Sequence, residues 1–461
     1  MANVVRVHVQ VVPTLPERTV AVPPELVEQT ASEATVEFGA RSTTCHLAIT
    51  PGIGSTIQLS TSVADRLVID GDMRINARWE GSRLALGPVI GVIADTHEKP
   101  ASLFSEQTKL FHELSQEAKR RGAILFIFTP YGVNFAKQTI KGYIASSRDD
   151  FGSWQRKRFP FPAVVYDRTF YRGAEEKVTD RMTARLARQK GVKLVNSEIG
   201  DKWKVHQELS HQSELRPNLP ETILIGENDG LERFLDHHRL VYLKPARGSQ
   251  GRGIIRIERG LTGGFVIQYQ NAEREIRRSF AGLSSLRVHL RRLFGGRHYL
   301  AQQGIDLIKH DGSLVDLRLI VQKNAEGNWG VTGMAARVGR RGSSVTNLHR
   351  GGHAVPIPSL LATHFPLRAK KLTAQIKRLG CSAAASIEKA YGPLGELGID
   401  LGLDRRGRVW YIEANPKPGR RVFLLIGAPE TRRKTIVRPL EYAMTLAGFP
   451  PSAARRDQDG N

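Results

Sequence analysis

Three short, uninterrupted apolar runs constrain the fold of this chain more than any other feature. Val89–Ala94, Ile124–Phe128 and Val164–Tyr166 are continuous hydrophobic segments, a pattern typical of strands that are buried on both faces. Leu103–Arg121, between the first two runs, has helical spacing and ends at Gly122, a residue that often terminates helices. Strand, helix and strand joined by short connections predict a parallel α/β layer.

The chain divides on either side of this layer, and its 461 residues suggest about three domains. Short β-rich segments precede the layer, among them a hairpin over Met73–Leu86 that turns at Glu80 and Gly81. A mixed α+β pattern follows it. The predicted fold class is therefore α/β (α+β). We expect a small β-rich module at 1–86, an α/β domain at 87–175, an α+β domain at 176–447 and a disordered tail at 448–461.

Composition excludes several classes of protein. The two cysteines, Cys45 and Cys381, lie far apart and form no metal-binding or disulfide pattern. The longest apolar stretches are much shorter than the roughly 20 residues that span a bilayer, and the first residues alternate like a strand instead of resembling a signal peptide. The sequence therefore predicts a cytoplasmic protein without a membrane span.

The formal net charge is +23, and nearly all of the excess lies in the second half of the chain. Residues 1–230 carry a net charge of +2, whereas residues 231–461 carry +21. Such an excess favours anionic partners, among them nucleotides, nucleic acid, an anionic surface or an acidic substrate. The arginine-rich segments Arg274–Arg297 and Arg432–Arg438 contribute much of it.

A glycine-rich hairpin with a lysine at its mouth lies at residues 241–257, VYLKPARGSQGRGIIRI. Gly248, Gly251 and Gly253 permit positive φ and close backbone approach, Ser249 adds a hydroxyl, and Lys244 ends the entering strand. The N–H groups of such a turn can hold phosphate oxygens. The pattern is equally compatible with a purely structural turn.

A second hairpin, residues 395–420, brings oxygen-bearing side chains together. If its turn is centred on residues 404–407, Asp400 lies opposite Tyr411, with Glu413 as its diagonal neighbour on the same face. Asn415 shares that face because it lies two residues beyond Glu413. Two carboxylates and an amide oxygen suit Mg²⁺ that is held together with phosphates. Alternatively, Asp400 and Glu413 pair with nearby arginines.

Together these motifs resemble the ATP-grasp superfamily, and most closely the YheC/YheD (endospore coat-associated) group. A lysine-bearing glycine-rich hairpin is followed by Asp400 and, 13 residues later, by Glu-x-Asn with Pro-Gly close behind. Residues 87–440 share this resemblance, which includes the segments LGPVIGVIAD, FPFPAVVYDR, LPET, YLAQQGIDLIKHDGSLVDLRLIVQK and EANPKPGR. It implies an ATP-grasp fold after a parallel α/β domain.

The resemblance also implies roles for individual residues. It places nucleotide-binding groups at Lys202, Lys244, Gly248, Ser249, Gly251, Gly253, Gln302, Gln303 and Ile305. It places Mg²⁺ ligands at Asp400, Glu413 and Asn415, and catalytic groups at Arg318, Arg337, Asn347 and Arg350. The last two belong to the loop VTNLHRGGHA, which resembles the Asn-x-His-Arg-Gly-Gly loop of ribosomal-protein glutamate ligases.

The implied activity is an ATP- and Mg²⁺-dependent ligase that joins a small-molecule or peptide carboxylate to an amine or thiol through an acyl-phosphate. Two other interpretations stay open: a spore-coat-associated or scaffold protein that binds nucleotide without turnover, and a basic nucleic-acid-binding protein. The remaining positive charge suggests a further anionic partner in the C-terminal half. Two further features are interpreted as structural and not functional. His237 and His238 are expected to be surface residues, and Phe151–Phe161 is expected to pack at a domain edge.

Overall fold

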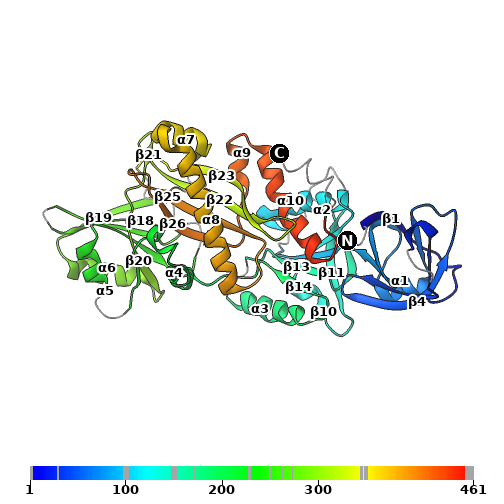
Figure 1. Cartoon of the computed structure of the whole chain (residues 1–461). Coiled ribbons are helices and arrows are strands. Elements are labelled where there is room, and N and C mark those ends of the chain that lie inside the picture. The colour runs from blue at the N-terminus through cyan, green and yellow to red at the C-terminus, as the bar shows by residue number, and fades with distance from the viewer. Residues whose placement is uncertain are drawn as a thin grey trace.

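A computed structural model shows a row of sheets that begins with an N-terminal barrel at one end of the molecule (Figure 1). The structure describes residues 4–27, 31–96, 103–146, 153–170, 173–226, 230–248, 251–261, 263–271, 274–342, 346 and 351–451. Ser249, Asn347, Arg350 and residues 452–461 of the predicted tail lie outside these ranges. Within them, no helix is long and apolar enough to cross a membrane.

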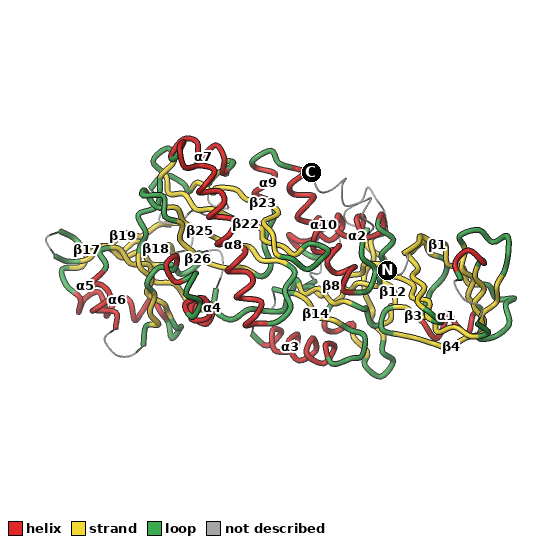
Figure 2. The backbone as a smooth tube through the Cα atoms, viewed as in Figure 1, coloured by secondary structure: helices red, strands yellow, loops and turns green. Residues whose placement is uncertain are grey.

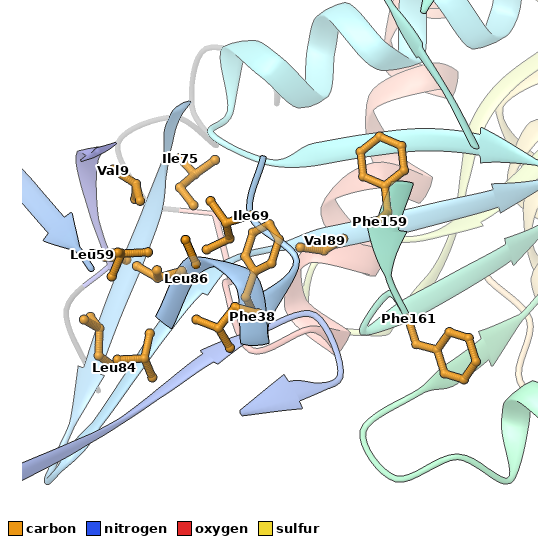
Figure 3. Packing of buried hydrophobic residues seen from close by; sticks show 14 of the residues in the cluster. Val9, Phe38, Leu59, Ile69, Ile75, Leu84, Leu86, Val89, Phe159 and Phe161 are labelled. Atoms are coloured by element: carbon orange, nitrogen blue, oxygen red, sulfur yellow. The ribbon is translucent and has the colours of Figure 1, made fainter. Parts of the chain in front are cut away.

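The first strands form a closed barrel in the order β1-β5-β2-β4-β3-β7-β6. The hairpin predicted over Met73–Leu86 is confirmed, because β6 and β7 pair antiparallel with Glu80 opposite Arg83. Apolar side chains from alternate strand positions, such as Val9 and Leu59, fill the barrel (Figure 3). The elements are β1 (Val4–Val11), β2 (Thr19–Val22), β3 (Glu33–Phe38), β4 (Arg41–Ile49), β5 (Thr56–Leu59), α1 (Thr61–Leu67), β6 (Met73–Glu80) and β7 (Arg83–Gly87).

The three apolar runs are adjacent parallel strands of the next sheet, as predicted. Its order is β10-β11-β9-β8-β13-β14, with β12 paired to β11. The predicted helix is present as α2, which packs against β9. The elements are β8 (Val89–Ile93), α2 (Thr108–Arg120), β9 (Ile124–Phe128), β10 (Val133–Asn134), β11 (Thr139–Ala145), β12 (Trp154–Pro160), β13 (Val164–Asp167), α3 (Ala174–Ala187) and β14 (Lys193–Val195).

An antiparallel sheet in the order β15-β20-β16-β17-β18-β19 follows, at the end of the molecule opposite the barrel (Figure 1). Leu286 and Leu290 of α6 and Phe234 of α5 bury one face of this sheet. Lys244 and Gln302 alternate with residues of the apolar cluster on this face and so lie on the opposite face. The elements are α4 (Lys202–Ser210), β15 (Thr222–Leu224), α5 (Gly230–His237), β16 (Leu240–Pro245), β17 (Ile255–Arg259), β18 (Phe265–Asn271), β19 (Arg274–Phe280), α6 (Leu283–Phe294) and β20 (Tyr299–Gln303).

The last sheet has the order β24-β23-β22-β25-β26 and lies in the middle of the molecule (Figure 2). Leu317 and Leu319 of β22 pack in the cluster that α8 covers, whereas Ile320 packs with α9. The elements are β21 (Lys309–His310), β22 (Ser313–Lys323), β23 (Trp329–Val338), β24 (His353–Val355), α7 (Ile357–His364), α8 (Ala369–Tyr391), β25 (Glu396–Leu403), β26 (Val409–Asn415), α9 (Arg421–Leu425) and α10 (Pro429–Leu446).

Helix α10 returns to the parallel sheet and packs on α2. Arg432 forms a salt bridge with Glu113 of α2, and Arg433 lies 3.2 Å from Glu117 (Nε to Oε1). These two arginines, which the sequence left without a role, therefore hold two parts of the molecule together.

Candidate functional site

The glycine-rich segment forms the predicted hairpin. Strands β16 and β17 pair antiparallel, with Leu243 opposite Ile255. The φ angles of Gly248, Gly251 and Gly253 are 138°, 68° and 75°, so each occupies the region that L side chains rarely adopt. The glycines therefore use the conformational freedom that the sequence offered, and their role toward phosphate stays a prediction.

Lys244, at the end of β16, is buried, with 9% of its surface exposed. Its Nζ donates to Oε1 of Gln302 at 2.5 Å, and the Gln302 amide donates to the Thr222 hydroxyl at 3.1 Å. Burial lowers the pKa of Lys244 to about 8, with a smaller contribution from Lys202, while the carboxylates of Glu413 and Asp400 oppose that shift. A lysine in this setting is a cation that its surroundings only partly compensate.

Lys202 connects the glycine-rich turn to the carboxylate hairpin. It is the first residue of α4, whose N-terminus is capped by Asp201 through the N–H groups of Trp203 and Lys204. The Lys202 Nζ donates to the carbonyl oxygen of Gly248 and lies 3.6 Å from Oε1 of Glu413. The two lysines that the family resemblance singled out therefore lie close together, next to the second hairpin.

The second hairpin differs from the predicted register. Asp400 lies directly opposite Glu413, and Leu401 lies opposite Tyr411, so the prediction that Asp400 faces Tyr411 is wrong. Two changes cause the difference: Leu403 pairs with Val409, so the turn is one residue longer than predicted, and a β-bulge at Ile412 inserts one extra residue into β26. The two carboxylates are consequently direct neighbours, and Asn415, opposite Gly398, occupies the next position on the same face.

The alternative that arginines pair with these carboxylates holds for Asp400. Arg318 reaches it twice, from Nε to Oδ1 at 2.5 Å and from Nη2 to Oδ2 at 3.0 Å, and Arg337 donates to Oδ2 at 2.8 Å. Burial by itself would raise the pKa of Asp400, but the charges and hydrogen bonds of the two arginines outweigh burial and lower it. Asp400 is therefore held as a carboxylate.

Asp316 completes this group, and the sequence reasoning missed it. Both of its oxygens accept from Arg337 at 2.6 Å, and the Thr346 hydroxyl donates to it. The available signal was the Asp-x-Arg spacing of residues 316 and 318, which places both side chains on one face of a strand. Thr346 is followed in the sequence by Asn347, which with Arg350 lies outside the described residues.

The donor set suits a cation that phosphates also bind. No hydrogen bond from the described residues reaches the Glu413 carboxylate, which has Lys202 as its ion-pair partner, while Oδ1 of Asn415 accepts from the Lys417 N–H at 2.9 Å. The described residues hold no cluster of three or more His, Cys, Asp or Glu side chains around one point. Mg²⁺ often binds through one or two carboxylates plus phosphate oxygens. Glu413 and Asn415 fit that donor set, whereas both oxygens of Asp400 already accept from arginines.

Three residues implied in nucleotide binding lie at the end of β20, the strand that pairs with the Lys244 strand β16: Gln302 and Gln303 are its last residues, and Ile305 lies two residues beyond. Gln303 pairs with Glu221, to whose carbonyl it donates at 2.8 Å, and Ile305 accepts from the Leu307 N–H at 2.9 Å. Between them the backbone packs closely on Leu240, since a Cβ on Gly304 would lie 2.2 Å from the Leu240 side chain. Of the three, Gln302 contacts Lys244; the binding of nucleotide by Gln302, Gln303 and Ile305 stays a prediction.

The two histidines at the end of α5 have different surroundings. His237 is exposed, and His238 lies 2.9 Å from Glu221 (Nε2 to Oε2). The prediction that both are surface residues holds for His237, whereas His238 is partly buried.

Comparison with known proteins identifies a matching family and two similar proteins. A family model described as YheC/D like ATP-grasp matches residues 191–446. Endospore coat-associated protein YheD of Bacillus subtilis (strain 168) is 28% identical over 420 residues, which cover 89% of this chain and 90% of that protein. Endospore coat-associated protein YheC of the same organism is 26% identical over 335 residues, covering 72% of this chain and 91% of that protein.

Solved structures show a more distant likeness. The VanG D-Ala:D-Ser ligase from Enterococcus faecalis superimposes with a TM-score of 0.45 at 12% identity, over 77% of this chain and 99% of that chain. For the D-alanine-D-alanine ligase from Coxiella burnetii the TM-score is 0.43 at 10% identity, over 80% and 97% of the two chains. The range matched by the family model contains both sheets that carry Lys244, Asp400 and Glu413.

Proposed function

This chain belongs to the YheC/D-like ATP-grasp family, and on that premise we propose that it is an ATP- and Mg²⁺-dependent ligase. It joins a carboxylate to an amine or a thiol by way of an acyl-phosphate. A carboxylate is a poor electrophile, so amide formation needs activation, and phosphorylation of the carboxylate provides it.

One observation carries the proposal: two lysines and two carboxylates from distant parts of the chain lie close together. Lys202 contacts both the glycine-rich turn and Glu413, and the charges of Glu413 and Asp400 act on Lys244. A lysine binds phosphate oxygens as a point charge, and the backbone N–H groups of a glycine-rich turn beside it bind the same oxygens. The opposed carboxylates supply the ligands for a cation on the same phosphates.

The chain's own residues have distinct roles in this proposal. Lys202 and Lys244 hold the nucleotide phosphates, and Asp400, Glu413 and Asn415 hold Mg²⁺, which when bound neutralises charge on the phosphate oxygens. Asp316 and Asp400 fix Arg337 and Arg318 in place. Guanidinium groups fixed in this way can stabilise negative charge on the transferred phosphoryl group without reorganising. The glycine-rich turn excludes water from the acyl-phosphate.

The decisive test measures binding and turnover separately. Calorimetry should show that Mg²⁺-ATP binds the wild-type chain and that Lys244→Ala weakens binding by at least about tenfold, because a charged phosphate contact is lost. Lys309→Ala, at an exposed lysine on β21, is the matched control and should bind as the wild type does. Unchanged binding by folded Lys244→Ala would contradict the site.

Turnover is then measured as phosphate release with a panel of carboxylic acids, amines and thiols. We expect release of ADP and phosphate that depends on both an acid and an acceptor. Release that no acid stimulates, despite ATP binding, would contradict the ligase activity and leave the nucleotide site intact.

A second candidate is an ATP-binding protein without turnover that associates with the spore coat, as the names of its relatives suggest. The pairing of Asp400 with two arginines favours it, because this arrangement neutralises the carboxylate with protein groups alone. ATP binding without phosphate release across the whole panel is the result expected for this candidate.

A further inference from the structure

A strongly basic hollow lies on the hairpin formed by β11 and β12. It is distant in sequence from Lys244, Asp400 and the other residues of the candidate site. Lys141 pairs with Arg158 across the hairpin, and Tyr143 pairs with Arg156. Lys141, Arg156, Lys157 and Arg158 line a hollow of about 370 Å³. Every lining residue is a cation, so a ligand of this hollow must be anionic.

These cations are largely uncompensated. Lys157 lies 4.0 Å from Asp70 of the neighbouring barrel (Nζ to Oδ2). Among the residues that the structure describes, Lys141, Arg156 and Arg158 have no carboxylate partner, and all three are exposed. The paired arginines Arg432 and Arg433 of α10 show that other basic segments of this chain are used internally.

The aromatic residues beside these cations are not available to stack on nucleic-acid bases. The Trp154 ring packs edge-on against Phe104 at 4.9 Å, and the Phe159 ring stacks on Phe126 at 4.2 Å. Phe159 points into the core that continues from the barrel (Figure 3). Arg156 lies over the Tyr143 ring at 5.8 Å. Single-strand binding depends on stacking platforms, and this surface offers charge without one.

The backbone of β12 provides a second recognition element. Among the described strands, β12 pairs with β11 alone, so its other edge carries backbone groups that another strand can pair with. Alternate strand residues lie about 6.6–6.8 Å apart on one face. Arg156 and Arg158 therefore match carboxylates at alternate positions of an extended chain, and each guanidinium can bind a carboxylate through two parallel hydrogen bonds.

We propose that the edge of β12 and the basic hollow bind an extended acidic polypeptide segment. The segment adds to β12 as a strand, and its alternate Asp or Glu side chains pair with Arg156, Arg158 and Lys141. A nucleic acid has phosphates but no peptide groups, so it would use the cations without the strand edge.

Charges on an edge strand also prevent self-association, and the experiment must separate this role from binding. The probe is a short fluorescent peptide of alternating Glu and Thr, with a Gln-Thr peptide and an oligothymidylate of equal length as comparisons. Anisotropy is measured on the full chain. The variants are Arg156→Glu/Arg158→Glu, the milder Arg156→Gln/Arg158→Gln, and the control Arg277→Glu/Arg278→Glu, which changes two exposed arginines of the edge strand β19.

We expect the Glu-Thr peptide to bind the wild-type chain at least about tenfold more tightly than the Gln-Thr peptide. Charge reversal at Arg156 and Arg158 should abolish this binding, the Gln variant should weaken it, and the β19 control should retain it. The Gln variant also keeps the test valid if the reversal impairs folding, which unfolding curves report.

Three results would overturn the proposal. The first is tighter binding of the oligonucleotide than of the acidic peptide, with the steep salt dependence of phosphate contacts. The second is equal loss of peptide binding in the β19 control. The third is no peptide binding together with oligomerisation of the Arg156/Arg158 variants, which would leave protection of the edge as the role of these charges.

Discussion

At the scale of single residues, Lys244 shows a conflict between stability and binding. Its burial lowers its pKa from 10.5 to about 8, so the native state disfavours the charged form that a phosphate would need. Nearby Glu413 and Asp400 compensate only part of this cost. Sites that keep such a group commonly give up stability for function.

The pH dependence of stability follows from this shift. Because the native pKa lies below the unfolded value, the unfolded chain binds more protons between about pH 8 and 10.5, and this lysine makes the native state more stable as pH rises through that window. Lys244→Met should raise the unfolding free energy at pH 7 by roughly 1–3 kcal/mol and remove that increase. Urea unfolding at pH 7 and pH 9 measures both effects; equal pH slopes for the two proteins would contradict the prediction.

At the scale of elements, close backbone approach determines where α8 lies on the central sheet. Gly380 faces β22, and a Cβ there would come within 2.8 Å of the Leu319 side chain. The helix therefore accepts a residue that is intrinsically about 1 kcal/mol less favourable than Ala in a helix, in exchange for tight packing on the sheet.

Replacing this glycine tests which effect dominates. Gly380→Ala gains helix propensity but overpacks the buried contact with Leu319, so we expect a net loss of roughly 1–2 kcal/mol in unfolding free energy. Lys389→Ala, at an exposed position of the same helix, should change it by less than about 0.5 kcal/mol. Chemical denaturation measures both, and stabilisation by Gly380→Ala would show that the helix can move away from the sheet.

At the scale of the whole molecule, one buried carboxylate joins the parallel sheet to the central sheet. Glu396 of β25 is fully buried and accepts from Arg168 at 2.8 Å and from Gln322 at 2.8 Å. The Tyr166 hydroxyl and Arg420 also donate to it. Glu396 lies on the same face of its sheet as Asp400. Strand β25 therefore carries both the residue that connects the two sheets and a residue of the candidate site.

Neutralising this residue should weaken the joint. Glu396→Gln leaves two buried arginines without their counter-charge, and we expect a loss of roughly 3–5 kcal/mol. Glu214→Gln, at an exposed glutamate, is the control and should be neutral. Denaturant unfolding monitored by tryptophan fluorescence reports the midpoint. A variant as stable as the control would show that Tyr166 and Gln322 hold the two sheets without the charge.

Local pattern was sufficient to predict much of the fold. The apolar runs around Val89 and Ile124 predicted buried parallel strands, and the glycines after Lys244 predicted a turn with positive φ. A buried strand depends on burial and a turn depends on interactions within a few residues. Both leave a local pattern of apolar residues or glycines that can be read from the sequence. The same local signals, taken together, were specific enough to identify the family.

Tertiary structure decided what depends on contacts between distant segments. The bulge at Ile412 moved Glu413 opposite Asp400, although the turn residues predicted another register. The pairing of Asp316 with Arg337 and the use of Arg432 by Glu113 likewise join residues from different strands or helices. A charge in the sequence has many possible partners, and only packing brings one of them within hydrogen-bonding distance. The sequence therefore determined which chemical groups this protein carries, and the fold determined which of them compensate one another and which remain available to a ligand.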